Sequence, residues 1–250
     1  MSASRIVTRG LVLRATETKE ADYILTVLTA ERGKIAVIAR GARRRGSKIA
    51  AASQLLVFSE LVLYERKGWY YLDEASTVEQ FTALRADLEL LALGSYFAEM
   101  TETVAPEDTA APELLSLLLN ALYALDTLHK PQALVRAAFE LRLLAHAGYE
   151  PLLDGCAVCG AENPQQPHFD LQEGVVLCCK CAGINAGLAI DSGSLAAMRH
   201  IVSAPMKKLL SFTLDAAPQE RLSAACELFA VAQLERKFKT LDFYKSIKLT

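Results

Sequence analysis

The order of hydrophobic and polar positions divides the chain into a strand-rich beginning and a helical remainder. Between residues 5 and 80, short runs of β-branched and aromatic residues alternate with turns. Gly33 and Gly68 occupy two of these turns, where glycine accepts a positive φ. The runs cover residues 6–13, 23–28, 34–40, 61–64 and 69–72. Five short strands in about 80 residues predict a small closed β-barrel of the OB-fold type.

Apolar residues recur at helical spacing after Glu79. Pro131 and Gly148 mark the ends of two of the expected helices. The predicted helical segments are residues 84–100, 114–128, 133–147, 194–203 and 219–239. Residues 150–190 are rich in glycine, proline and cysteine, and we expect them to be irregular. The pattern predicts an α+β multidomain chain, with an OB-fold domain at residues 1–80 and a mainly helical domain at 81–250.

Composition is compatible with a folded protein that stays in the cytoplasm. Hydrophobic residues make up 52% of the 250 positions, enough for a packed core. No run of 18 apolar residues occurs, so no membrane span is expected, and residues 1–10 do not resemble a secretory signal. Because cytoplasmic thiols stay reduced, the six cysteines need an explanation other than disulfide bonds.

Four of the cysteines form two C-x-x-C pairs. Cys156 and Cys159 are followed, after 18 intervening residues, by Cys178 and Cys181. Two thiolates spaced in this way can bind one ion from a tight turn, and two such turns complete a tetrahedron. Gly160 and Gly183 give the backbone freedom just beyond each pair. The spacing predicts one structural Zn²⁺ in a module at about residues 150–190, where metal binding would supply folding energy.

Other interpretations of these cysteines are a disulfide pair, a redox C-x-x-C motif or buried thiols. A redox motif normally occurs once, at a helix start that follows a strand. Four available thiolates also make a catalytic zinc with an open position less fitting. Cys179 competes with Cys178 for the third ligand position, but its spacing to Cys181 is one residue short. His168 is expected at the surface, and Cys226, on an apolar helix face, in the core.

Charge is distributed unevenly along the chain. The formal net charge is −2, but residues 1–80 hold 13 Lys/Arg against 9 Asp/Glu, and the remainder holds 14 against 20. Residues 32–48 contain no acid and seven cations, namely Arg32, Lys34, Arg40, Arg43, Arg44, Arg45 and Lys48. Such a run can contact several phosphates of a nucleic acid, with an affinity that falls as salt rises. The alternative is a solvated surface loop.

Aromatic residues of the expected barrel could add stacking surfaces for unpaired bases. The candidates are Tyr23, Phe58, Tyr64, Trp69, Tyr70 and Tyr71. At least half of them are expected to fill the barrel, and Trp69, next to Gly68 at a hairpin tip, is the ring most expected in solvent. A second basic cluster lies in residues 236–248, as a helix end or as a site for an acidic peptide.

Several motifs, in order, resemble the RecO family of bacterial recombination mediators. They are Glu20-Ala21-Asp22, Leu28-Thr29, Gly33-Lys34, the run from Ala39 to Arg44, the run from Phe139 to Leu144, Gly148 to Pro151 leading to Cys156, and Tyr244-Lys245-Ser246. The resemblance implies an OB-fold, a helical domain with a zinc module, and a function in DNA repair without enzymatic activity.

The resemblance also implies binding of single- and double-stranded DNA, annealing of complementary strands, and loading of RecA onto DNA coated by the single-strand-binding protein SSB. RecR, possibly RecF and the acidic SSB tail would be partners, near the nucleoid. By position, Arg40, Arg43, Arg44, Arg45 and Lys48 would contact the DNA backbone, and Lys34 of the same basic run is a further candidate.

Three other functions use the same residues. The chain could be an RNA-binding or transcription-associated OB/zinc-ribbon protein, an enzyme subunit whose catalytic partner is elsewhere, or a zinc-stabilised scaffold that binds only proteins. No catalytic site is predicted, because the four histidines are scattered and no Gly-rich phosphate loop occurs.

Overall fold

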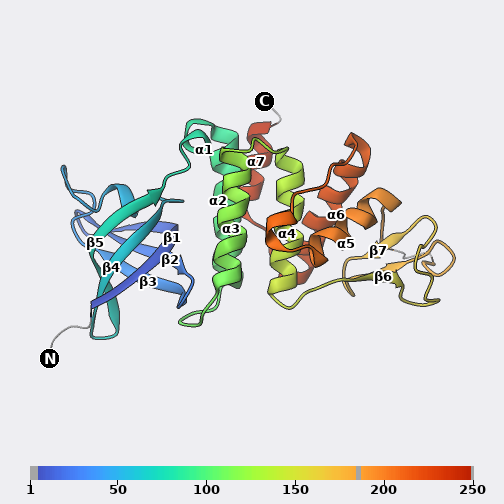
Figure 1. The fold of residues 1–250 in the computed structure, drawn as a ribbon, viewed down its shortest axis with the longest axis horizontal. Coiled ribbons are helices and arrows are strands. Elements are labelled where there is room, and N and C mark those ends of the chain that lie inside the picture. Colours follow the sequence, from blue (N-terminus) through green and yellow to red (C-terminus); the bar gives the residue numbers. More distant parts are fainter. Residues whose placement is uncertain (1–4, 184–186, 249–250) are drawn as a thin grey trace. The chain divides into compact units, whose positions relative to one another are not determined.

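Residues 5–79 form a closed five-stranded barrel in the computed structural model, which describes residues 5–183 and 187–248 (Figure 1). The order around the barrel is β1-β2-β3-β5-β4, and β3 pairs with β5 in parallel while the other pairs are antiparallel. The strands are β1 (Arg5–Thr18), β2 (Asp22–Thr29), β3 (Gly33–Ala39), β4 (Phe58–Arg66) and β5 (Trp69–Glu79). The predicted OB-type barrel is confirmed.

Aliphatic side chains fill the barrel. Its core includes Val12, Leu25, Val27, Ile35, Val37, Leu61 and Leu63. Of the six candidate rings, all of which the structure describes, none is fully buried, and Tyr23 and Tyr70 pack against this core from its margin. The expectation that half of the rings fill the barrel is therefore wrong, because a five-stranded barrel encloses little more than branched aliphatic side chains. Trp69 is 48% exposed, as expected.

Helices follow the barrel from Thr82 onward. They are α1 (Thr82–Ala86), α2 (Leu88–Val104), α3 (Pro112–Asp126), α4 (Gln132–His146), α5 (Ser192–Ser203), α6 (Ala216–Leu234) and α7 (Lys239–Lys248), with 3₁₀ turns η1 (Ala51–Ser53) and η2 (Met206–Lys208). The expected helix over 84–100 is divided at Asp87, whose carboxylate accepts a hydrogen bond from the Leu90 N–H at 3.0 Å. The expected helix over 219–239 ends early, because Glu235 adopts φ 48°.

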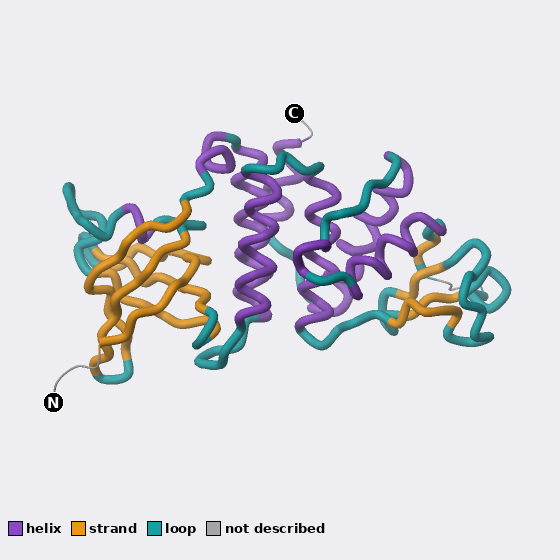
Figure 2. Tube along the Cα trace, in the orientation of Figure 1, coloured by secondary structure: helices purple, strands orange, loops and turns teal. Residues whose placement is uncertain are grey.

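The cysteine-rich segment contains a small sheet instead of being irregular. Figure 2 shows strands in two parts of the chain, the barrel and this sheet, whose order is β6-β8-β7-β9. Its strands are β6 (Leu152–Cys156), β7 (His168–Asp170), β8 (Val175–Leu177) and β9 (Leu188–Ala189). Runs of two to five residues are too short to give a periodic pattern, so the sequence could not predict them.

The chain divides into two compact units. One comprises Met1–Leu128 and Phe238–Thr250, and the other His129–Lys237. The first unit thus contains the barrel together with α1, α2, α3 and α7. The boundary expected at residue 80 is where the strands end and the helices begin. Among the described residues, no helix is both long enough and apolar enough to cross a membrane.

Candidate metal centre and basic loop

Two similar turns carry the cysteine pairs of the second unit. After Cys156, the Gly160 N–H donates to the Cys156 carbonyl at 2.9 Å, and Gly160 has φ 72°. After Cys178, the Ala182 N–H donates to the Cys178 carbonyl at 2.9 Å, and Gly183 has φ 61°. Each glycine therefore has the backbone freedom that the sequence predicts beyond each pair.

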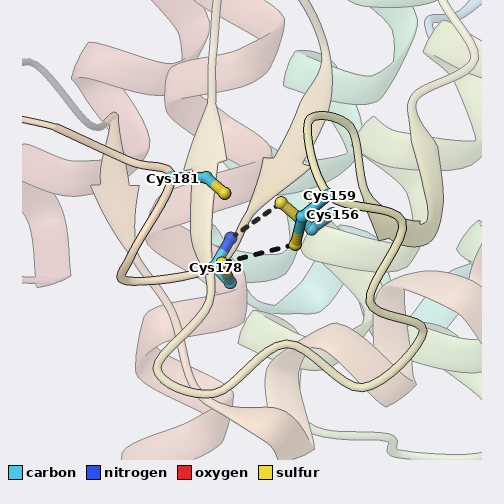
Figure 3. A group of neighbouring side chains, drawn as sticks. All are labelled: Cys156, Cys159, Cys178 and Cys181. Carbon is cyan, nitrogen blue, oxygen red and sulfur yellow. Dashed lines mark hydrogen bonds between the residues drawn. The ribbon is translucent and has the colours of Figure 1, made fainter.

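The four thiol groups of the two turns converge. Figure 3 shows Cys156 and Cys159 pointing toward Cys178 and Cys181, and all four Sγ atoms lie within 4.8 Å of one another. The Sγ atoms of Cys159 and Cys178 are 3.8 Å apart. A tetrahedral ion with metal–sulfur bonds of about 2.3 Å would place its sulfurs about 3.8 Å apart. The cluster can therefore hold one metal ion.

Backbone hydrogen bonds prepare part of this cluster for ionisation. Backbone hydrogen bonds from Cys159 and Cys178 lower the pKa of the Cys156 thiol to about 6. The Cys178 N–H donates to the Cys156 Sγ at 3.3 Å. Similarly, a backbone hydrogen bond from Cys181 lowers the pKa of Cys178. Hydrogen bonding to Cys178, followed by burial, raises the pKa of Cys181 to about 12. Because neighbouring thiolates repel one another, full ionisation of the cluster requires a cation.

Other cysteines and the nearby histidine lie outside the cluster. Cys179 is exposed, and its backbone N–H donates to the Gln165 carbonyl at 3.2 Å. The second turn thus presents Cys178, in agreement with the spacing argument. His168 lies partly buried on β7. Cys226 is fully buried on α6, as expected, and burial raises the pKa of its thiol.

Side chains from α5 and α6 hold the cysteine module through its backbone carbonyls. Arg199 donates to the carbonyls of Leu153 at 2.7 Å, Asp154 at 3.0 Å and Glu162 at 2.7 Å. Gln233 donates to the carbonyls of residues 171 and 172 at 2.8 and 2.9 Å. No local sequence pattern predicts either residue, because their partners lie 37 to 62 positions away.

The basic loop, defined here as residues 40–48, is fixed at its base. Ala42 and Ile49 are buried in the barrel core on either side of its tip. The Gly41 N–H donates to the Asp22 carboxylate at 2.7 Å, which ties the loop to the start of β2. Anchored in this way, the loop presents its tip to solvent in a defined place.

The six candidate DNA contacts have different surroundings. Arg44, Arg45 and Lys48 are exposed on the basic loop, and no ion pair of theirs is found in the described part of the chain. Arg43 lies 2.9 Å from the Glu17 carboxylate. The guanidinium of Arg40 covers the ring of Tyr71 at 4.6 Å. The loop thus brings five of the six candidates together.

Lys34 lies apart from the basic loop in an acidic setting. Its ammonium is 3.5 Å from the Glu107 carboxylate and donates to the Glu102 carbonyl at 3.0 Å, leaving the side chain 20% exposed. Arg14, which the sequence analysis missed, is 2.7 Å from the Glu102 carboxylate. These residues line a groove of about 330 Å³ that also includes Trp69 and Asp108. Acids thus neutralise the cations of this groove, whereas the loop keeps its positive charge.

An OB-type barrel, followed by helices with an inserted four-cysteine cluster, defines a class of modular α+β proteins. Two family models match almost the entire chain, "Recombination protein O N terminal" over residues 1–81 and "Recombination protein O C terminal" over residues 85–242. The chain therefore belongs to the RecO family of DNA repair proteins. This family consists of recombination mediators and is not enzymatic, which confirms the prediction that the chain is no enzyme.

Individual relatives agree with the family models. The chain is 33% identical over 241 residues to the DNA repair protein RecO of Acetivibrio thermocellus, with 96% of each chain covered. It is 36% identical over 247 residues to the protein of the same name from Anaeromyxobacter dehalogenans strain 2CP-C, with 97% of each covered. The resemblance found in the sequence motifs is thereby confirmed along nearly the full length.

Proposed function

We propose that this chain binds single- and double-stranded DNA through its basic loop, anneals complementary strands and helps RecA to load onto SSB-coated DNA. The exposed tip of the basic loop, with Arg44, Arg45 and Lys48, is the observation that carries the proposal. Such a tip can screen the repulsion between the phosphates of two strands. Base pairing then supplies the specificity, so annealing needs no covalent chemistry.

The proposed contacts have an order of importance. Arg44, Arg45 and Lys48 contact phosphates directly, and Arg43 joins them by exchanging Glu17 for DNA. Arg40 contacts DNA where the loop meets the end of β3, beside Tyr71. Lys34 contributes least, because Glu107 already neutralises it.

Partner proteins would bind elsewhere on the chain. Residues 81–250 hold 14 Lys/Arg and 20 Asp/Glu, a balance that disfavours extensive contact with phosphates. We assign the surfaces for RecR, possibly RecF and the SSB tail to this part. The protein would act in the cytoplasm at the nucleoid.

One structural Zn²⁺ is proposed for the cysteine cluster, with Cys156, Cys159, Cys178 and Cys181 as ligands. Four sulfurs complete the coordination and leave no position for a reactive water. Metal analysis of the purified chain should give one zinc per molecule, and cobalt substitution should give the visible spectrum of a tetrahedral thiolate site. A chain purified under reducing conditions that binds neither metal would contradict the assignment.

Strand annealing tests the DNA-binding proposal. Wild type is compared with Arg44→Ala/Arg45→Ala across a salt series. Lys207→Ala/Lys208→Ala serves as a matched control, since it also removes two exposed cations, from η2. The loop variant should lose most annealing activity, and its log–log salt slope for single strands should flatten by about 1.4, at about 0.7 per phosphate contact.

The outcomes separate DNA binding from the alternatives. Equal behaviour of the loop variant and the control would remove the loop from the DNA contact. A wild-type chain that neither binds nor anneals DNA at low salt would favour the protein-binding scaffold. Preference for RNA oligonucleotides over DNA would favour the RNA-binding alternative.

A further inference from the structure

Three planar groups form a column on the outside of the barrel. The rings of Tyr64 on β4 and Tyr71 on β5 stack with centroids 5.2 Å apart and planes 10° from parallel. The guanidinium of Arg40, just beyond β3, lies 4.6 Å from the centre of the Tyr71 ring. Because β5 lies between β4 and β3, Tyr64 and Arg40 approach Tyr71 from opposite sides.

The column is not part of the barrel core. Leu63, Leu72 and Ala39, which precede or follow its members in the strands, are buried inside the barrel. Since neighbouring residues of a strand point to opposite faces, Tyr64 and Tyr71 point outward, where both are half-buried. Arg40 is exposed.

Charge differs between the two strands that flank the column, β3 and β1. At one end, Arg40 begins the basic loop with its exposed cations Arg44 and Arg45. Beyond the Tyr64 end, on β1, the cations are matched by acids. Arg5 lies 3.6 Å from Glu74, and likewise Arg9 lies 3.5 Å from Glu60. A polyanion would therefore be held at the Arg40 end, with its uncharged parts directed along the column.

We propose that the Tyr64–Tyr71–Arg40 column is a stacking platform for unpaired bases, which makes this face of the barrel prefer single-stranded over duplex DNA. The inference rests on the proposed DNA-binding function and adds which form of DNA is recognised and by which groups. A base stacks on an end of the column, while its phosphate contacts the basic loop. Duplex bases are already stacked on one another, so they gain nothing from the column.

A merely structural role is the competing explanation, since stacked cross-strand aromatic pairs also stabilise sheets. The two roles differ in what substitution changes. If the pair is only structural, its loss lowers the free energy of unfolding and weakens the binding of single-stranded and duplex DNA equally. If it is a stacking platform, its loss weakens the binding of single-stranded DNA selectively.

The test compares full-length wild type with Tyr64→Leu/Tyr71→Leu for binding to an oligothymidylate and to a duplex of equal length, across a salt series. Single-strand affinity should fall about tenfold or more. Duplex affinity and the salt slope should be unchanged, because no phosphate contact is lost. Tyr64→Phe/Tyr71→Phe should bind as wild type, and so should Tyr123→Leu, which removes an exposed tyrosine from α3.

Arg40→Lys provides a second route if the leucine variant does not fold. This substitution keeps the positive charge and removes the planar guanidinium, so the affinity for single strands should fall while the affinity for duplex DNA is retained. An equal loss for both forms of DNA, or no loss for single strands, would overturn the inference. If wild type binds DNA and only Arg44→Ala/Arg45→Ala weakens it, the inference fails and the proposed function stands. A wild type that binds no DNA overturns both.

Discussion

The barrel and the cysteine module gain their stability in different ways. Strands β1 to β5 have 7 to 14 residues, and they enclose an aliphatic core of their own. Strands β6 to β9 have two to five residues, and the few buried side chains among them include Leu153, Phe169 and Val176. A sheet this short cannot bury enough apolar surface to order itself. The comparison indicates that the proposed zinc and the polar clamps supply much of the stability that a core supplies in the barrel.

The two regions also present their polar groups differently. Buried Ala42 and Ile49 fix the basic loop, so its exposed side chains Arg44, Arg45 and Lys48 are not needed to hold it. In the module, the cysteine side chains are themselves the proposed crosslink, through the zinc ion. Substitutions in the basic loop should therefore change DNA binding without changing the stability of the barrel. Substitutions of the cysteines should change metal binding and the stability of the module together.

The largest effect is expected from loss of the proposed metal ligands. Cys156→Ser should expose residues 152–189 to proteolysis and lower the free energy of unfolding of the second unit by several kcal/mol, since zinc binding supplies folding energy there. Cys179→Ser is the matched control, because this thiol is exposed and outside the cluster. Thermal unfolding, zinc content and limited proteolysis measure the effect.

DNA affinity per folded molecule should be nearly unchanged in Cys156→Ser. The anchors of the basic loop lie in the barrel and not in the cysteine module. A folded variant of unchanged stability that loses DNA binding would contradict this separation of roles.

A buried charge network in the second unit should give the next largest effect. Arg136 on α4 lies 2.6 Å from the Glu227 carboxylate, 2.6 Å from the Ser223 hydroxyl and 3.3 Å from the fully buried Glu140. Arg136→Met should cost about 3 kcal/mol in urea unfolding, because two carboxylates lose the charge that balances them in a buried place. Arg9→Met, which breaks an exposed pair on the barrel, should cost less than about 1 kcal/mol. Equal losses of unfolding free energy in the two variants would show that burial does not make the Arg136 network more important than the exposed pair.

How far the sequence predicts this molecule depends on the distance over which each interaction acts. The barrel strands and the two cysteine turns follow from patterns within a few residues, such as alternation, Gly33 and the C-x-x-C spacing. The Tyr64–Tyr71 stack and the Arg199 hydrogen bonds depend on the strand register and on helix packing, which no local pattern contains. The acidic setting of Lys34 comes from Glu107, 73 positions later, so charge density alone could not reveal it.

An intermediate effect is expected for the clamp on the module. Arg199→Leu removes three hydrogen bonds to backbone carbonyls around the first cysteine turn. The loss should cost about 1–3 kcal/mol and speed the release of zinc to a colorimetric chelator. Arg199→Lys, which keeps the charge without the planar fork, should fall between wild type and Arg199→Leu. Unchanged zinc release in Arg199→Leu would mean that the module is ordered by its metal alone.

The smallest effect concerns Asp191, which joins the module to α5 as the helix N-cap. Its carboxylate accepts a hydrogen bond from the Ser194 N–H at 2.7 Å and lies 2.7 Å from Arg221. Burial opposes ionisation, but these two partners outweigh it and lower the pKa of Asp191. Asp191→Ala should cost about 1 kcal/mol at pH 7.

The pH dependence of that cost identifies its cause. A carboxyl group with a lowered folded-state pKa stabilises fully above its unfolded pKa of about 3.9, and the contribution fades as the pH falls through the folded value. The difference in unfolding free energy between wild type and Asp191→Ala should thus be constant from pH 7 to about 5 and shrink below about 4. Paired urea titrations at each pH measure it, because acid effects on the metal ligands act on both proteins alike. A difference that stays constant down to the lowest pH would mean that the side chain acts through packing and not through its charge.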